Sequence, residues 1–232
     1  MTLIVGVQCR DGLLLSSDRE ENDGIGKGSV RKIFDSAGPC QFAIATSGYA
    51  ALADVCVKRV EEAAIAAGRK FADRHEEIIE DVLREIHVRY IWPTEIPDAQ
   101  ERQIQLIVGL YDAANQPCLY VTSEEIVQPK DSFVCAGCGS EVGDYFLERL
   151  FDPSLTIHEA KMLVSFVIRE VKSSIAEVGQ ETEQVTITPA GTSRTLAADT
   201  DIPRLAECMN HFWKTKPGIA KIAKAEIRKG NR

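Results

Sequence analysis

Thr2 is the first residue of this sequence that could do chemistry, because it directly follows the initiator Met1. Aminopeptidases generally remove Met before a small residue, and its removal would leave Thr2 with both a hydroxyl and a free α-amine. A hydroxyl is a weak nucleophile until a base takes its proton, and the amine can be that base. An α-amine has an unperturbed pKa of about 7.7–8.0, and a nearby ammonium would lower it further. Many proteins begin with Met-Thr without such a function, so this pair alone predicts little.

Other residues with chemical potential are scattered or miss the spacing of known sites. Cys135 and Cys138 form a Cys-x-x-Cys pair, but no second pair and no suitably spaced histidines accompany them. Buried or strand-end thiols are therefore expected rather than a redox pair or a zinc site. The glycines at 24–28 and 137–139 miss both phosphate-loop patterns. Acidic residues crowd the segment 73–81, which predicts a solvated or inter-subunit helix face. We expect no cofactor and no metal.

Hydrophobic patterning predicts strands and then two helices in the first ninety residues. Apolar runs at 2–9 and 12–17 flank the turn residues Arg10-Asp11-Gly12, and strands are also predicted at 30–34 and 41–45. The polar, glycine-rich stretch 20–29 predicts a surface loop. Apolar residues then recur at helical spacing over 52–67, with Gly68 as the expected stop, and over 79–90, before Pro93.

The same order of strands followed by helices repeats in the remainder of the chain. Strands are expected at 104–111, 118–122, 133–136, 183–188 and 193–198, and helices at 140–151, 156–176 and near 203–213. Short loops between strands favour antiparallel sheets, whose faces the paired helices must cover. This order predicts an α+β fold, and a four-layer αββα sandwich of two antiparallel sheets flanked by helices would bury those faces. We expect one domain at residues 1–213 and a basic C-terminal tail at 214–232.

Several segments, taken in order, resemble one family. The opening (TLIVGV from Thr2, then Asp11-Gly12, then Ser17-Asp18-Arg19) resembles that of proteasome β-type subunits. Later segments resemble the family's next blocks in order and spacing over about residues 2–190: Arg31-Lys32-Ile33, Ala45-Thr46-Ser47-Gly48, Gly137-Cys138-Gly139 and Leu155-Thr156-Ile157-His158-Glu159-Ala160. The chain is therefore similar to the proteasome/HslV superfamily of N-terminal nucleophile hydrolases, whose fold is the αββα sandwich.

The resemblance implies a role for each matching residue. Thr2 would be the nucleophile, with its own amine as base. Lys32 would lower the pKa of that amine or hydroxyl, and Asp18 would hold the lysine in place. The backbone N–H of Gly48 would face the developing oxyanion. Without the family order, these residues could equally be a strand end, an edge-strand lysine and a helix start.

Two positions depart from the family pattern. Cys138 stands where the family usually has a serine whose hydroxyl is thought to support the nucleophile's amine, and a thiol is a weaker hydrogen-bond donor. The family's later Asp-x-x-Ser-Gly element should fall near residues 175–180, where this chain has Ile175-Ala176-Glu177-Val178-Gly179. These departures allow a different proton-shuttling arrangement or a loss of activity.

Composition and charge limit the remaining classes of function. The chain has 232 residues, 44% hydrophobic and 27% charged, which excludes a disordered or fibrous protein. No apolar run approaches the roughly 20 residues that span a bilayer. Seven irregularly spaced cysteines do not indicate a disulfide framework, so a cytoplasmic location is expected. Seven Lys or Arg and one Glu after residue 213 leave a net charge of −14 on residues 1–213, which argues against nucleic-acid binding.

We hypothesise from the sequence a threonine-type endopeptidase that acts on peptides or unfolded proteins inside a homo-oligomeric ring. The resemblance also makes an ATP-dependent unfoldase a candidate partner, and the basic tail is expected to dock on a neighbouring subunit. Two alternatives stay open. One is a non-catalytic ring subunit of the same fold, and the other is an N-terminal nucleophile amidase that acts on a small amide.

Overall fold

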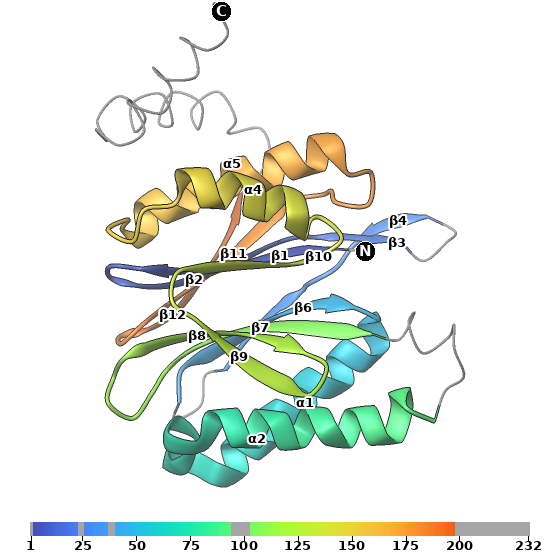
Figure 1. Ribbon diagram of the computed structural model, residues 1–232, viewed down its shortest axis with the longest axis vertical. Coiled ribbons are helices and arrows are strands. Elements are labelled where there is room, and N and C mark those ends of the chain that lie inside the picture. The colour runs from blue at the N-terminus through green and yellow to red at the C-terminus, as the bar shows by residue number, and fades with distance from the viewer. Residues whose placement is uncertain (1, 23–25, 37–39, 94–102, 198–232) are drawn as a thin grey trace, which may run out of the picture.

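Two five-stranded antiparallel sheets form the centre of the structure (Figure 1). The computed structural model describes residues 2–22, 26–36, 40–93 and 103–197. The first sheet has the order β10-β1-β2-β11-β12, with the bounds β1 Leu3–Cys9, β2 Gly12–Asp18, β10 Phe133–Gly137, β11 Thr182–Thr188 and β12 Gly191–Ala197. The second has the order β5-β6-β7-β8-β9, with the bounds β5 Ile33–Asp35, β6 Phe42–Gly48, β7 Ile104–Tyr111, β8 Pro117–Ser123 and β9 Ile126–Lys130.

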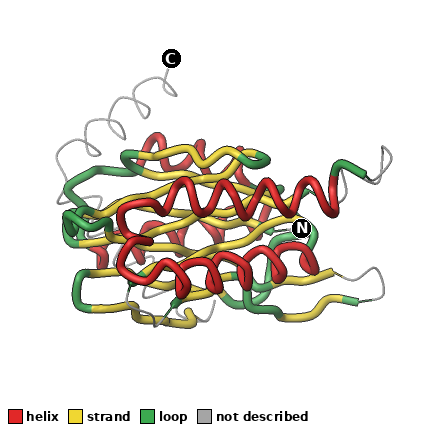
Figure 2. The backbone as a smooth tube through the Cα atoms, turned by 90° about the horizontal axis from the view of Figure 1, so that it is seen from below, coloured by secondary structure: helices red, strands yellow, loops and turns green. Residues whose placement is uncertain are grey.

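Helices cover the outer face of each sheet. Two lie on the first sheet, α4 (Ser140–Leu150) and α5 (Ile157–Ser174). The second sheet carries α1 (Ala50–Ala67) and α2 (Phe71–Ile86). A short 3₁₀ helix, η1 (Gly68–Lys70), joins α1 to α2, and a π-helical turn, η2 (His87–Ile91), continues α2. Figure 2, seen from below, shows α1 and α2 in front of the second sheet and running roughly along its strands. The described residues therefore form the predicted four-layer αββα sandwich.

Three apolar cores hold these layers together. The core between the sheets contains Ile4, Leu15, Ile107 and Val185, all without solvent exposure. Separate cores lie under α4 and α5 and under α1 and α2. Since both faces of β1 and β2 are buried, Leu3–Val7 and Gly12–Leu15 are apolar runs without alternation.

Local sequence accounts for the helix ends. Thr156 and Glu159 form a reciprocal capping box at the start of α5, in which the Glu159 N–H donates to Thr156 Oγ1 and the Thr156 N–H to the Glu159 carboxylate. Gly68 ends α1 with a positive φ of 56°, as predicted, because glycine adopts this conformation without a steric cost.

The observed elements depart from the predicted ones at several places, since β5 begins at Ile33 rather than 30 and α2 begins at Phe71 rather than 79. The segment 20–29 is not simply a loop, because β3 (Glu20–Asn22) and β4 (Lys27–Ser29) pair in a short antiparallel hairpin. The edge strand β9 was not predicted, since Pro129 interrupts its pattern. The helix expected near 203–213 and the tail 214–232 lie outside the described residues, and the proposed domain division stays a prediction. Among the described helices, none has the length and apolarity needed to cross a membrane.

Candidate active site

Thr2 is held by its own main chain at the end of the first sheet. Its carbonyl oxygen accepts a hydrogen bond of 2.9 Å from the Cys138 N–H, which continues the β1–β10 ladder beyond the Leu3–Gly137 pair. Gly137 has a φ of 95°, and a Cβ there would lie 2.0 Å from the Thr2 carbonyl oxygen. Only glycine therefore allows β10 to approach Thr2 this closely.

A buried carboxylate lies directly behind Thr2. Asp18 ends β2 with no solvent exposure, and its Oδ1 accepts the N–H of Leu3 at 2.9 Å. Its Oδ2 accepts the N–H groups of Glu20 at 3.0 Å and Gly179 at 3.2 Å. A carboxylate removed from water needs such partners, because an uncompensated buried charge is costly. Asp18 thus joins β1, the start of β3 and the segment after α5.

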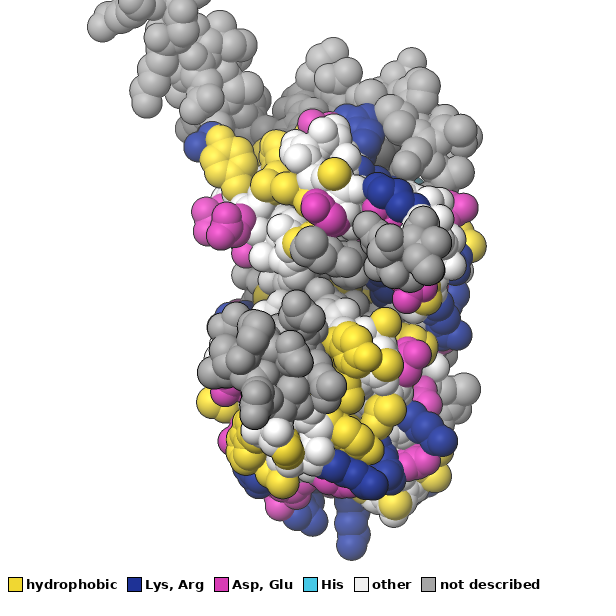
Figure 3. Space-filling view, turned by 90° about the vertical axis from the view of Figure 1, so that its right-hand side faces the viewer, with side chains coloured by type: hydrophobic (Ala, Val, Ile, Leu, Met, Phe, Trp, Pro, Cys, Tyr) yellow, Lys and Arg dark blue, Asp and Glu magenta, His cyan; other side chains and the backbone are white. Residues whose placement is uncertain are grey.

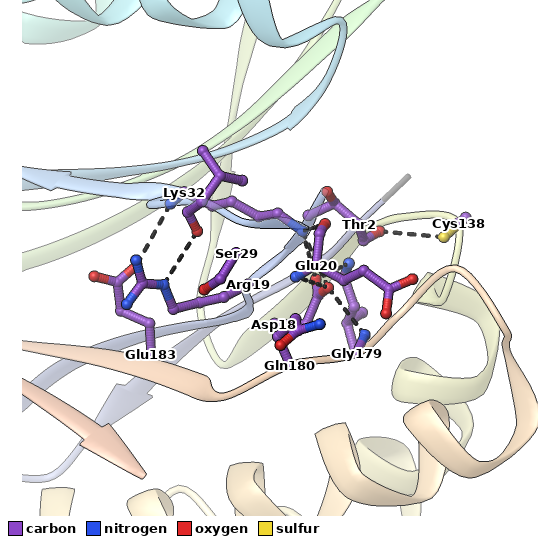
Figure 4. A network of polar contacts seen from close by, with 12 residues as sticks. Thr2, Asp18, Arg19, Glu20, Ser29, Lys32, Cys138, Gly179, Gln180 and Glu183 are labelled. Carbon is purple, nitrogen blue, oxygen red and sulfur yellow. Dashed lines mark hydrogen bonds and ion pairs between the residues drawn. The ribbon is translucent and has the colours of Figure 1, made fainter. Parts of the chain in front are cut away.

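Lys32 completes the charge pair. Its Nζ lies 3.1 Å from Asp18 Oδ1 and 3.0 Å from Asp18 Oδ2, and it donates a hydrogen bond of 2.6 Å to the carbonyl oxygen of Glu20. Because the Leu3 N–H and Lys32 Nζ share Asp18 Oδ1, the lysine reaches the peptide that follows Thr2 (Figure 4). The lysine is 5% exposed. Burial lowers its pKa from 10.5, and the attraction of Asp18 opposes this only in part.

Thr2 and Lys32 open onto a cavity of about 530 Å³. The wall opposite them is the end of β6 and the start of α1, where Gly48 lies with a φ of 105°. A Cβ at Gly48 would lie 2.1 Å from the Gln103 carbonyl oxygen, so this bend also requires glycine. Figure 3 views the side of the molecule at which this end of the sheets lies. The cavity offers room for a substrate beside the Thr2 hydroxyl.

The five predicted site residues come together in the fold. Thr2, Lys32 and Gly48 line the cavity, Asp18 binds Lys32 from behind, and Cys138 touches Thr2. The Cys138 Sγ lies 3.5 Å from the Thr2 carbonyl oxygen, and partial burial raises the pKa of this thiol. The thiol is thus directed at the Thr2 carbonyl oxygen.

The chain after α5 reaches the site through its main chain. Besides its bond to Asp18, Gly179 accepts a hydrogen bond of 3.2 Å from the Arg19 N–H. Lys27 adds a second link, because its Nζ lies 2.6 Å from Glu20 Oε1 and donates to the Ala176 carbonyl oxygen at 2.7 Å. This segment therefore supports Asp18 without the side chains of the family's Asp-x-x-Ser-Gly element.

Three supporting residues were not predicted from the sequence: Glu20, Gly179 and Glu183. The first two act largely through main-chain atoms, which side-chain motifs do not reveal. Glu183 is a buried acid, 2% exposed, in a strand distant in sequence from Lys32. A charged residue inside an otherwise apolar and threonine-rich strand was the available signal.

The arrangement suits nucleophilic attack by a hydroxyl. It combines a buried cation at a threonine, a carboxylate that fixes this cation, and a glycine backbone across an open cavity. Such groups can favour a deprotonated nucleophile and stabilise negative charge that develops on a substrate oxygen.

Comparisons with known proteins relate the chain to one family. The model of the family "Proteasome subunit" matches residues 2–187. No sequence among curated proteins matches the chain. An Anbu mutant from Hyphomicrobium sp. strain MC1 superposes with a TM-score of 0.75 at 17% identity, covering 97% of this chain and 100% of that one.

Two other solved structures are similar over most of their length. The helical assembly of the Anbu complex from Pseudomonas aeruginosa gives a TM-score of 0.75 at 16% identity, covering 93% of this chain and 97% of that one. Anbu, an ancestral β-subunit, from Yersinia bercovieri gives 0.70 at 13% identity, with coverage of 93% and 98%. At these identities, the likeness establishes a shared fold.

Proposed function

This chain belongs to the proteasome subunit family, and on that premise we propose that it is a threonine-type endopeptidase with Thr2 as its nucleophile. The observation that carries the proposal is the buried Lys32–Asp18 pair, which ends at the Thr2 peptide on the wall of a substrate-sized cavity. A pair with 7% and 0% side-chain exposure contributes little net stability, since desolvation offsets most of the attraction. Its place beside Thr2 favours a catalytic role.

The proposed reaction begins after removal of Met1. The α-amine of Thr2 takes the proton of the hydroxyl, and Thr2 Oγ1 forms a bond to the carbonyl carbon of the substrate. The backbone N–H of Gly48 stabilises the resulting oxyanion. The carbon–nitrogen bond then breaks, the leaving amine takes the proton, and an ester to Thr2 remains. Water hydrolyses this ester, with the α-amine again acting as base.

Lys32 and Asp18 act on the nucleophile through charge. The ammonium of Lys32 disfavours a second positive charge at the Thr2 amine and so lowers the pKa of that amine. Asp18 holds the ammonium in place with both carboxylate oxygens. Asp18 also accepts hydrogen bonds from main-chain N–H groups of three segments. These bonds fix the position of the carboxylate, and therefore of the lysine, beside Thr2.

Intact mass after exposure to a threonine-directed β-lactone tests this proposal. We expect a chain without Met1 that carries one adduct, and no adduct on Thr2→Ala. The same Thr2→Ala change should abolish cleavage of peptide-aminocoumarin reporters. Thr195→Ala is the matched control, because Thr195 contacts Lys161 on the outer surface, and it should behave as the unaltered protein.

A non-catalytic subunit of the same fold is the second candidate. Cys138 in place of a serine and the absence of a hydroxyl side chain over 175–180 favour it. Retained Met1 with no adduct would support this candidate. Cleavage of a small amide, but of no peptide, would instead support the amidase.

We also propose that the chain assembles with copies of itself in the cytoplasm, with peptides or unfolded proteins as substrates. The similar Anbu complex from Pseudomonas aeruginosa forms a helical assembly. Large apolar side chains are exposed at Tyr49, Val88 and Trp92, and Figure 3 shows apolar side chains gathered over the lower half of one face. Such surface favours protein contacts, and sedimentation far above the 25.6 kDa monomer would support assembly. The same proposal includes an ATP-dependent unfoldase as the partner that delivers substrates.

A further inference from the structure

The backbone of Lys32 lies just beyond the paired residues of β5 and β6. Their pairing begins at Ile33 and Ala45, and the carbonyl oxygen and the N–H of Lys32 have partners on different sheets. Its carbonyl oxygen accepts the Thr46 N–H at 2.9 Å. Its N–H donates to Glu183 Oε2 at 3.4 Å. Because Lys32 is buried, this N–H needs an acceptor, and a carboxylate from the other sheet supplies it.

Both the main chain and the side chain of Glu183 in β11 have partners on neighbouring strands. Its own carbonyl oxygen accepts the Ser16 hydroxyl at 3.0 Å, and the second carboxylate oxygen, Oε1, pairs with Arg194 Nη1 on the adjacent strand β12. A carboxylate that is 2% exposed is retained only where a cation compensates it. Arg194 therefore makes it possible for an acid to lie beneath Lys32.

Arg194 also binds β5, the strand that begins directly after Lys32. Its Nη2 donates to the Ile33 carbonyl oxygen at 3.0 Å and pairs with Asp35. Arg31 binds the same two groups from the other side, through Nε at 2.7 Å from the Ile33 oxygen and Nη2 at 2.7 Å from Asp35. The Glu183 carboxylate thus binds the peptide before the Lys32 Cα, and the Thr46 N–H binds the peptide after it. Both arginines bind the next carbonyl oxygen, that of Ile33, so the backbone from which the Lys32 side chain extends is held at three successive peptides.

We propose that Glu183 is a positioning residue for the nucleophile: by accepting the Lys32 N–H, and itself held by Arg194, it fixes the Lys32 backbone so that Nζ meets Asp18 beside Thr2. This inference rests on the proposed function for its link to catalysis. Glu183 acts through the main chain, since Lys32 Nζ is bonded to Asp18 and to the Glu20 carbonyl oxygen. Small displacements of catalytic groups are costly, and a shift of about 1 Å can slow a reaction on the order of 100-fold.

Two substitutions of similar volume separate this role from simple stability. Glu183→Gln keeps an oxygen that can accept the Lys32 N–H, whereas Glu183→Met does not, and both remove the ion pair with Arg194, which keeps its pair with Asp35. We expect Glu183→Met to lose roughly 100-fold in the rate of acylation by the β-lactone, and Glu183→Gln to stay within about 10-fold of the unaltered protein. Glu181→Ala is the control, because this nearby acid is exposed and accepts a hydrogen bond from the exposed Ser29 hydroxyl.

A second readout reports on Lys32 itself. The Cε resonance of Lys32 is followed against pH by NMR in protein with ¹³C-labelled lysine, and Lys32→Arg assigns the signal. The midpoint of this titration is the pKa of the Lys32 amine, and its measurement requires no enzymatic activity. In Glu183→Met the midpoint should move toward that of an ordinary lysine, while Glu183→Gln should keep the original one. Equal midpoints in folded Gln and Met variants would overturn the proposal. Absence of acylation in the unaltered protein would count against the peptidase alone.

Folding of each variant is established first by circular dichroism. If Glu183→Met does not fold, the same comparison is made in an Arg194→Met background, where no guanidinium lies beside the apolar side chain at position 183. Replacement of a buried ion pair by apolar residues of similar volume is often tolerated. The proposal is supported if, in this background, the low titration midpoint of Lys32 is lost with Glu183→Met and kept with Glu183→Gln. A low midpoint in both double variants contradicts the proposal.

Discussion

At the scale of single residues, the charge of Lys32 links the structure to a pH dependence. Burial is the largest influence on this amine and lowers its pKa from 10.5, against the attraction of Asp18. In the proposed reaction the protonated lysine lowers the pKa of the Thr2 amine, so loss of its proton removes that help. We expect kcat/KM for a peptide-aminocoumarin to fall on the alkaline side with a midpoint below 10.5, as measured in a pH–rate profile.

Lys32→Arg is the control for this profile, because a guanidinium stays protonated throughout the range. Residual activity in this variant should show no such alkaline limb, and its persistence would assign the limb to another group. Stability responds with the opposite sign. Between the lowered pKa and 10.5 the unfolded chain binds more protons than the folded chain, so the Lys32 contribution to the free energy of unfolding rises with pH.

The predictability of the site follows from the atoms that each residue contributes. Thr2, Asp18 and Lys32 were predicted because their side chains carry reactive or charged groups and their order matches a family pattern. Gly179 contributes an N–H to Asp18, and many residue types can supply an N–H. Glu183 meets Lys32 only because β11 pairs with β2 across more than 150 residues of sequence, a contact that local patterning does not encode.

At the scale of elements, the end of β10 sets the position of Thr2, and Gly137 is the critical point. Gly137→Ala would place a Cβ 2.0 Å from the Thr2 carbonyl oxygen at a φ of 95°. Since the obstacle is backbone, β10 must move away from β1. We expect a loss of about 1–3 kcal/mol in the free energy of unfolding, measured by urea denaturation, and a fall in acylation of Thr2 by the β-lactone of at least about 10-fold.

Gly191→Ala separates these two effects. Gly191 has a φ of 144°, but a Cβ there meets no atom within 4 Å, and it begins β12 at the end opposite the Thr182–Asp18 pair. This variant should carry backbone strain without displacing Thr2, so stability falls while acylation is unchanged. A similar loss of acylation in both variants would show that global strain, rather than the β10 contact, is responsible.

The elements that were predicted are those with a strong hydrophobic signature. The amphipathic helix α2 places Phe71, Ile79, Leu83 and Ile86 in the core, and such spacing is visible in sequence. The β3–β4 hairpin has three polar or glycine residues in each strand, and β4 is exposed throughout. Its pairing is supported by Lys27, whose Nζ pairs with Glu20 across the hairpin and donates to the Ala176 carbonyl oxygen outside it. Polar residues with such partners resemble a loop in sequence.

At the scale of the whole molecule, the close approach of the two sheets depends on small residues between them. Gly6 in β1 faces Ile107 and Leu119 of the opposite sheet, and Gly109 in β7 faces Leu13 and Ile187. Each glycine thus accommodates side chains of the other sheet. This interlocking fixes the spacing of the sheets and, through it, the distance from Thr2 on one sheet to Gly48 on the other.

Gly6→Ala tests this interlocking through two opposing effects. Alanine restricts the unfolded chain, which favours the folded state by about 0.4–1 kcal/mol, whereas overpacking costs about 1–3 kcal/mol. A Cβ at Gly6 would lie 2.6 Å from Ile107 Cγ2 and 2.8 Å from Leu119 Cδ1. Leucine can rotate its end away, but the β-branched isoleucine is stiff at χ1, so overpacking should prevail. We expect a net loss of about 1–2 kcal/mol.

Gly28→Ala is the matched control for urea denaturation, because a Cβ at this exposed glycine would meet no atom within 4 Å. It should leave the midpoint unchanged or raise it slightly. In Gly6→Ala the midpoint should fall with an unchanged slope, since the surface exposed on unfolding stays the same. An unchanged midpoint would mean that the two sheets accommodate the added methyl group without a loss of stability. The geometry between Thr2 and Gly48 would then depend on the local contacts of β10 and Lys32 rather than on the packing of the sandwich.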